Sequence, residues 1–236
     1  MPPEIRYFLH DGDTDAIQVR LTLSPEHHGL VVPDDYEAPP WARLEHCQCS
    51  HCPLDPARHR DCPIARNLAY TLPHQDLGES FREIDLRVED SQREYRTHTT
   101  VQRALSSLFG LVCALSDCPH TRFLRPMALF HLPVSTETET LARTVGFYLL
   151  GRYLATRSGE ERTLDLDDLN RAYRDLGELN RCFVQRFRQG GSDGPINAMI
   201  LLHVLSQDVN WELKDQLDAL ANLFTAATGD SGGRMQ

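Results

Sequence analysis

Four of the seven cysteines fall within sixteen positions, in the stretch HCQCSHCPLDPARHRDCP. Their spacing is Cys47-x-Cys49-x2-Cys52-x9-Cys62. A tetrahedral zinc site takes four thiolate or imidazole ligands, and a C-x2-C turn lets two sulfurs approach one ion. Cys49 and Cys52 meet this condition directly, and Cys62 lies one loop away, where it can close the site. The stretch therefore predicts a zinc site formed by Cys47, Cys49, Cys52 and Cys62.

The identity of the fourth ligand is undecided, because His46, His51 and His59 of the same segment could also supply it. An iron–sulfur cluster is the alternative cofactor, since cluster-binding loops also contain a cysteine followed by proline. A closed shell of thiolates is typical of structural zinc, whereas catalytic zinc keeps an open position. The metal is therefore expected to hold the loop together rather than to act on a substrate.

A second group of chemically active residues lies in CALSDCPHTRFLRPMALFHLP, residues 113–133. Its Cys118-Pro119 pair repeats the Cys-Pro pairing of the first stretch, so Cys118 is the alternative fourth zinc ligand. A reactive thiol at Cys118, with His120 or His131 lowering its pKa, would instead indicate thiol-redox chemistry. Cys113 falls on the apolar stripe of a predicted helix and is expected in the core, and Cys182 is expected to be structural.

Several polar residues border the apolar stripes of the C-terminal half and favour a binding pocket there. They are Gln102, Ser106, Arg143, Tyr148, Asn180, Arg186 and Asn197. Arg143, Arg186 and Arg188 can bind an anion through charge-assisted hydrogen bonds, which makes an anion or nucleotide sensor a further alternative. The simpler interpretation is that these side chains face solvent or bond between helices.

Composition restricts the classes of protein. With 41% hydrophobic and 25% charged residues, the 236-residue chain has the composition of a folded globular protein. A net charge of −10 disfavours nucleic-acid binding, and the apolar runs are too short to cross a membrane. No secretory leader is recognisable at the N-terminus, so we expect a cytoplasmic protein, where reducing conditions keep cysteines as thiols. The partner is then an unknown protein or a small anionic ligand.

The first hundred residues predict a small antiparallel sheet. Residues 5–9 and 17–23 alternate apolar and polar side chains around Asp11-Gly12, a sequence that favours a tight hairpin turn. A second pair of strands is expected over 83–90 and 93–100. The cysteine-rich segment, about 44–69, lies between the two hairpins, and a short helix is expected to begin just after Cys62-Pro63.

From residue 100 the apolar period becomes helical, and a capping box from Thr136 to Glu139 marks one helix start. Helices are expected over 100–116, from 136, and over 165–188, 195–208 and 211–227, followed by a disordered tail at 229–236. The fold class is therefore α+β: a small sheet with a cysteine-rich metal-binding insertion, followed by about five helices. A sheet lobe (1–99) and a helical lobe (100–228) are expected to form one compact unit.

Several segments together resemble an uncharacterised family of bacterial proteins known only as a domain of unknown function. These segments are RYFLHDGD, CSHCPL, CPIARNL, LSSLFGLVCALSDCP, LRPMALFHLP and INA. The resemblance implies that Cys49, Cys52, Cys62 and Cys118 belong to the family pattern, and it transfers no activity. No nucleophile elbow, phosphate loop, dinucleotide fingerprint or HExxH motif occurs. We therefore expect a non-enzymatic zinc-binding module that acts in binding or regulation.

Overall fold

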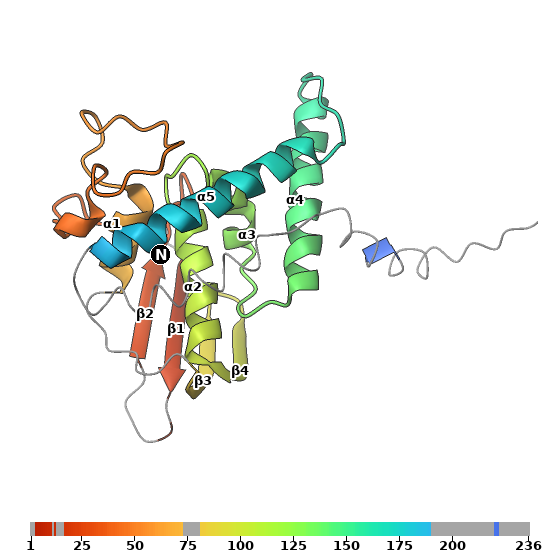
Figure 1. Ribbon diagram of the computed structural model, residues 1–236. Coiled ribbons are helices and arrows are strands. Elements are labelled where there is room, and N and C mark those ends of the chain that lie inside the picture. Colours follow the sequence, from red (N-terminus) through yellow and green to blue (C-terminus); the bar gives the residue numbers. More distant parts are fainter. Residues whose placement is uncertain (1–2, 11, 13–16, 73–80, 190–219, 222–236) are drawn as a thin grey trace, which may run out of the picture.

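A four-stranded antiparallel sheet with helices on one face forms the core of the protein (Figure 1). The computed structural model describes residues 3–10, 12, 17–72, 81–189 and 220–221. The strands are β1 (Glu4–His10), β2 (Ile17–Thr22), β3 (Glu83–Glu89) and β4 (Glu94–Thr100), in the order β2-β1-β3-β4. The predicted α+β class and the predicted sheet are confirmed.

Two hairpins make up this sheet, and they join along β1 and β3. Tyr7 of β1 lies opposite Val19 of β2 on one side and Val88 of β3 on the other. Gly12, in the turn between β1 and β2, has a φ of 50°, a backbone conformation that glycine adopts without strain. The cysteine-rich segment connects the first hairpin to the second, as predicted.

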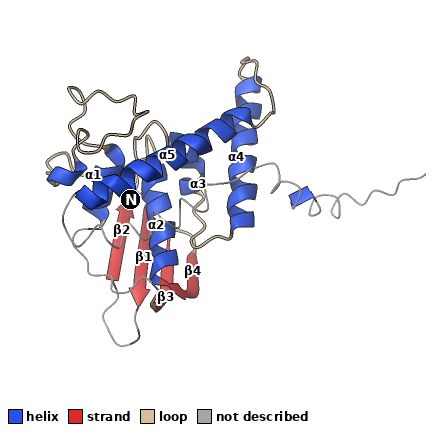
Figure 2. Cartoon of the chain, viewed as in Figure 1, coloured by secondary structure: helices blue, strands red, loops and turns tan. Residues whose placement is uncertain are grey.

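The sheet buries one face and leaves the other polar. Ile5, Tyr7 and Leu9 alternate along β1 and are all buried, because successive side chains of a strand point to opposite faces. On the other face, the Arg87 guanidinium lies 4.0 Å from the centre of the Phe8 ring. The helices therefore cover the apolar face (Figure 2).

Five α-helices occur within the described residues. They are α1 (Pro63–Thr71), α2 (Val101–Leu115), α3 (Arg125–Leu129), α4 (Glu137–Arg157) and α5 (Asp167–Gln189), with short 3-10 turns η1 (Pro40–Ala42) and η2 (Arg122–Leu124). The helix after Cys62-Pro63 begins where it was expected. At α4, the Thr136 side chain accepts from the Glu139 amide and the Glu139 side chain accepts from the Thr136 amide, so the predicted capping box is confirmed.

Helix α5 crosses the other helices and joins two apolar clusters (Figure 1). Leu179 and Phe183 belong to the core under the sheet, where the Phe183 and Phe109 rings meet edge to face at 6.3 Å. A second cluster joins α4 to the first half of α5 and contains Leu141, Val145, Leu169, Tyr173, Leu176 and Leu220. The main core thus contains residues of both the strands and the helices.

The predicted helices over 195–208 and 211–227, except residues 220–221, and the tail at 229–236 lie outside the described residues. In the part that is described, none of the helices has the length and apolar character needed to cross a membrane.

Replacement of Leu108 by Ala tests the packing of α2 against the sheet. Leu108 is fully buried in the main core, so Leu108→Ala is expected to lower the free energy of unfolding by about 2–5 kcal/mol. Urea denaturation of the full chain measures this change. The matched control is Leu164→Ala, because Leu164 is 67% exposed and its loss should change stability by less than about 0.5 kcal/mol. Similar losses in the two variants would contradict this packing.

Candidate functional site

The cysteine-rich segment forms a loop whose two ends are fastened together. Arg43 and Asp61 form an isolated β-bridge, and the Leu44 amide donates to the Arg60 carbonyl at 3.0 Å. The Cys62 amide donates to the Ala42 carbonyl at 2.8 Å. The backbone therefore returns to its starting point before α1 begins, and the cysteines are confined to a closed loop.

Within this loop, Cys49 and Cys52 form the tight turn that their spacing predicts. The Cys52 amide donates to the Cys49 carbonyl at 3.0 Å, and both side chains pack against the main core. Burial raises the pKa of the Cys49 thiol, and the neighbouring thiols of Cys182, Cys62 and Cys52 raise it further. Electrostatic interactions of this kind require that these four sulfurs lie near one another.

Cys62 and Cys118 share one local feature. Each cysteine precedes a proline, and backbone amides two and three residues further on lower the pKa of its thiol, against the larger effect of burial. These amides are those of Ile64 and Ala65 for Cys62, and of His120 and Thr121 for Cys118. Amides near a sulfur favour its thiolate form, because their N–H dipoles interact with the negative charge.

The Cys118 segment also packs directly on the cysteine-rich loop. His120 Nε2 donates to the His51 carbonyl at 3.1 Å, and the two imidazole rings are 4.1 Å apart. Burial raises the pKa of Cys118 to about 11, and the Cys62 and Cys52 thiols contribute to this shift. The structure therefore places the alternative fourth ligand beside the loop, although Cys118 and Cys62 are separated by more than fifty residues.

Cys47 takes part in the loop through its backbone. Its φ is 52°, an unusual conformation for a residue other than glycine, and its carbonyl accepts from Arg186 Nη2 at 3.3 Å. The thiols of Cys52, Cys62 and Cys182 act on that of Cys49. Cys182, predicted to be structural, thus lies next to the candidate site.

A buried arginine of α5 holds the start of the loop. Arg186 is 1% exposed, and its Nη1 donates to the carbonyls of Trp41 at 2.8 Å and Arg43 at 2.6 Å. Its Nη2 is 3.5 Å from the Leu44 carbonyl and 3.3 Å from that of Cys47. Arg186 was a candidate for anion binding, but these contacts direct most of its donors to the backbone. The side chain of Arg188 lies outside the described residues.

The end of α5 is attached to the loop along one face of the helix (Figure 1). His51 Nε2 donates to the Asp175 carbonyl at 3.1 Å, and Ser50 Oγ donates to Glu178 at 3.1 Å. Together with Cys182 and Arg186, these contacts follow a spacing of three and four residues along the helix. This stripe, beside the apolar stripe of an amphipathic helix, is the sequence signal that could have revealed the position of Cys182.

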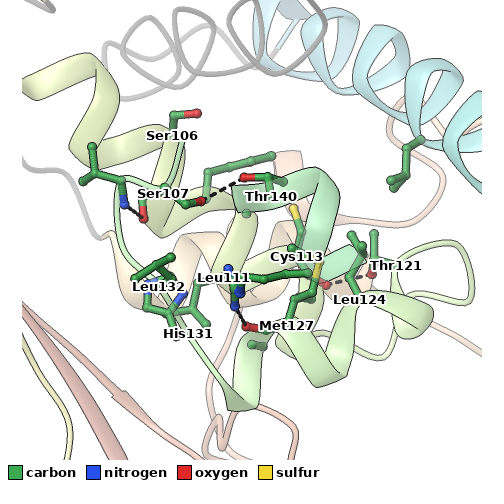
Figure 3. A pocket seen from close by; sticks show the side chains of 18 of the residues that line it. Ser106, Ser107, Leu111, Cys113, Thr121, Leu124, Met127, His131, Leu132 and Thr140 are labelled. Atoms are coloured by element: carbon green, nitrogen blue, oxygen red, sulfur yellow. Dashed lines mark hydrogen bonds between the residues drawn. The ribbon is translucent and has the colours of Figure 1, made fainter. Parts of the chain in front are cut away.

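A separate cavity of about 500 Å³ lies between α2, α3, α4 and α5. Figure 3 shows it bordered by Ser107 and Leu111 of α2, Met127 of α3, His131 of the next loop and Thr140 of α4. Three of the polar residues predicted to border a pocket line it, namely Ser106, Arg143 and Asn180. The cavity therefore lies beside polar residues that the sequence predicted to border a pocket.

The cavity wall contains a hydrogen-bonded group that joins the helices to the sheet. The Tyr7 hydroxyl bonds to His131 Nε2 and lies 3.0 Å from Ser107 Oγ, which also accepts from the Val134 amide at 3.1 Å. Burial lowers the pKa of His131 to about 3, and the nearby Arg143 charge lowers it further. The hydrogen bonds of Tyr7 to a neutral His131 and to Ser107 therefore hold this part of the cavity wall in place.

Comparison with known proteins places the chain in a family. A family model described as a domain of unknown function, DUF6901, matches residues 4–225. The chain belongs to this family. No curated protein and no solved structure matches the sequence. The expected family resemblance is thus confirmed, and it assigns no activity.

In this DUF6901 member all seven cysteines are free thiols. Within the described residues, no three His, Cys, Asp or Glu side chains are arranged as a group that could hold a metal ion. The thiols of the candidate site are neighbours, but they do not form a coordination shell in this structure. The predicted metal-binding role of the insertion therefore stays a prediction.

Replacement of Arg186 tests whether it holds the loop of this DUF6901 protein. Arg186→Met removes the donors to four backbone carbonyls, and each buried carbonyl left unpaired costs about 1–3 kcal/mol. We expect at least about 2 kcal/mol lower stability in urea denaturation and faster amide exchange at residues 41–62. The control is Arg181→Met, an exposed α5 residue that pairs with Glu178. Unchanged exchange in the loop of Arg186→Met would disprove the role.

Proposed function

We propose that this protein is a non-enzymatic bacterial zinc-binding module, located in the cytoplasm, in which Cys49, Cys52, Cys62 and Cys118 hold one structural zinc ion. The proposal retains three of the four ligands expected from spacing and takes Cys118 in place of Cys47. Zinc would fasten the cysteine-rich loop to the turn after α2, so that the helical part and the loop form one binding surface.

The buried charge of Arg186 is the observation that carries this proposal. Within the described part of the chain, no carboxylate lies within salt-bridge distance of its guanidinium, although the side chain is only 1% exposed. The guanidinium is close enough to Cys62 to lower the pKa of that thiol, against the larger effect of burial. A buried charge without a counter-charge is costly. A zinc ion with four thiolates carries a net negative charge and would supply the missing counterpart.

The choice of Cys118 as fourth ligand rests on its place beside the Cys62 and Cys52 thiols, which act on its pKa. Backbone amides after the Cys-Pro pair also lower the pKa of both Cys62 and Cys118, which favours the thiolate form that zinc requires. Cys182 differs, because its thiol is 3.8 Å from a carboxylate oxygen of Glu178, to which it can donate its proton. Cys182 is therefore better suited to pack against Cys49 than to bind zinc.

A structural role agrees with the composition of the loop. Residues 45–61 contain one large aliphatic side chain, Leu54, so burial of apolar surface contributes little to their order. Metal binding supplies folding free energy to such segments. Four thiolates leave no open position for a substrate, which supports a binding or regulatory role rather than catalysis.

Elemental analysis of the purified full chain tests the proposal. We expect about one zinc per chain, and most of this zinc should be lost in Cys118→Ser but retained in Cys47→Ser. A chelator is expected to lower the melting temperature by at least about 5 °C, because 1 kcal/mol corresponds to about 2–4 °C at this chain length. Metal-free protein that melts at the same temperature with and without chelator would disprove the zinc site.

Two further results separate the alternatives. Loss of zinc from Cys182→Ser with full retention in Cys118→Ser would make Cys182 the fourth ligand. A brown preparation made without oxygen, with visible absorption, would replace zinc by an iron–sulfur cluster. The thiol-redox alternative is less well supported, because burial and a pKa of about 11 keep Cys118 protonated and inaccessible at neutral pH.

A further inference from the structure

We propose that the cavity between α2, α3, α4 and α5 binds a small apolar carboxylic acid, with the carboxylate at Arg143 and the apolar body against the helices. The inference does not depend on zinc, because the cavity is a separate site. The proposed zinc site does not say what the module binds. The cavity adds this, because it indicates a class of ligand.

The charge of the cavity favours a single anion. Arg143 lies on its wall, and the carboxylate that acts on its charge is that of Glu139, one helical turn earlier and not among the residues that line the cavity. Nη2 of Arg143 donates to the carbonyls of Met127, at 3.0 Å, and Phe130, which fixes the guanidinium in place. The other charged residues that line the cavity are Arg103 and Glu137, which offset one another. One net positive charge remains, which suits a monoanion.

A buried amide adds a polar group to the cavity wall. Asn180 of α5 lines the cavity and is 5% exposed. A buried amide is stabilised by hydrogen-bond partners, and the cavity has room for one. A carboxylate or hydroxyl oxygen of a ligand is such a partner.

The rest of the wall is mainly apolar. It includes Leu111, Ala114, Leu124, Met127, Leu176 and Leu179. A volume of about 500 Å³ is within the range of roughly 300–1,000 Å³ that is typical of pockets for small organic ligands. These walls favour a hydrocarbon or aromatic body over a nucleotide, whose sugar and phosphates would need many polar partners.

Gly110 keeps this space open. It lies in the middle of α2 and lines the cavity, and a Cβ atom added to it would meet no atom within 4 Å. Glycine in a helix interior is unfavourable relative to alanine, so its place here is not explained by helix formation. The missing side chain leaves room that a ligand can occupy.

Calorimetric titration of the full chain with decanoate tests the proposal, on protein whose zinc content has been measured. We expect saturable binding that raises the melting temperature. Decanol, which has the same chain without the charge, should bind at least about tenfold more weakly, since a buried charge-assisted hydrogen bond is worth more than 1.4 kcal/mol. 2-Naphthoate distinguishes an aromatic from a linear body, and decyl phosphate serves as the dianionic comparison.

Three variants locate the site. Gly110→Leu places a side chain in the cavity and raises the helix propensity of this position. It should therefore abolish binding while the protein stays folded. Arg143→Met should weaken decanoate but not decanol, whereas Arg157→Met, an exposed α4 residue outside the cavity, should change neither. Asn180→Leu should weaken decanoate while the protein stays folded.

The proposal would be overturned by any of three results: no saturable binding of either carboxylate, equal binding of decanol, or tighter binding of decyl phosphate. Undiminished binding to Gly110→Leu would place the ligand elsewhere and also overturn it. The zinc content of each sample distinguishes these failures from a failure of the zinc proposal, because a protein with zinc that binds no carboxylate rejects only the cavity site.

Discussion

Much of the described structure depends on the hydrogen bonds that the buried guanidinium of Arg186 donates. This group is buried where the cysteine-rich loop begins, and it donates to one backbone carbonyl within η1 and to three that follow it. These carbonyls lie outside α-helices and strands, so the ladders of regular secondary structure do not satisfy them. The same contacts fix α5 to the loop, and α5 in turn completes the core through Leu179 and Phe183.

This arrangement gives α5 a place in both candidate sites. Its Cys182 and Arg186 lie at the cysteine-rich loop, while Asn180 and Leu176 line the cavity. Packed helices move as rigid bodies because protein interiors are dense. Residues of the loop and of the cavity are thus joined by one packed helix. A zinc ion in the loop and a ligand in the cavity would act on the same helix.

Both sites keep their ionisable groups neutral in the absence of a ligand. Burial raises the pKa values of Cys49, Cys62 and Cys118, so these side chains are thiols at neutral pH. Burial also keeps His131 uncharged, because its pKa falls to about 3. The fixed charges that remain are the guanidinium of Arg186 at the loop and that of Arg143 at the cavity. The Arg186 guanidinium has no carboxylate within salt-bridge distance among the described residues, and that of Arg143 interacts with Glu139, which does not line the cavity.

The sequence by itself determined the local structure. Alternating side chains predicted the strands, Gly12 the first turn, and Thr136 with Glu139 the start of α4, because these signals act over a few neighbouring residues. The Cys49–Cys52 turn followed from spacing for the same reason. A pocket in the helical part was also indicated by polar residues beside apolar stripes, since such residues must find partners.

Only the tertiary structure decided which distant residues meet. Arg186 contacts the carbonyl of Trp41, 145 positions earlier, and no spacing rule relates two such residues. For this reason the sequence could name Arg186 as a candidate for anion binding and Cys182 as structural, but not that both lie at the loop. Cys118 reaches Cys62 because α2 packs on the sheet and returns the chain to it. Side-chain chemistry is set by the sequence, but burial and neighbouring charge, which fix the pKa of each group, exist only after the chain has folded.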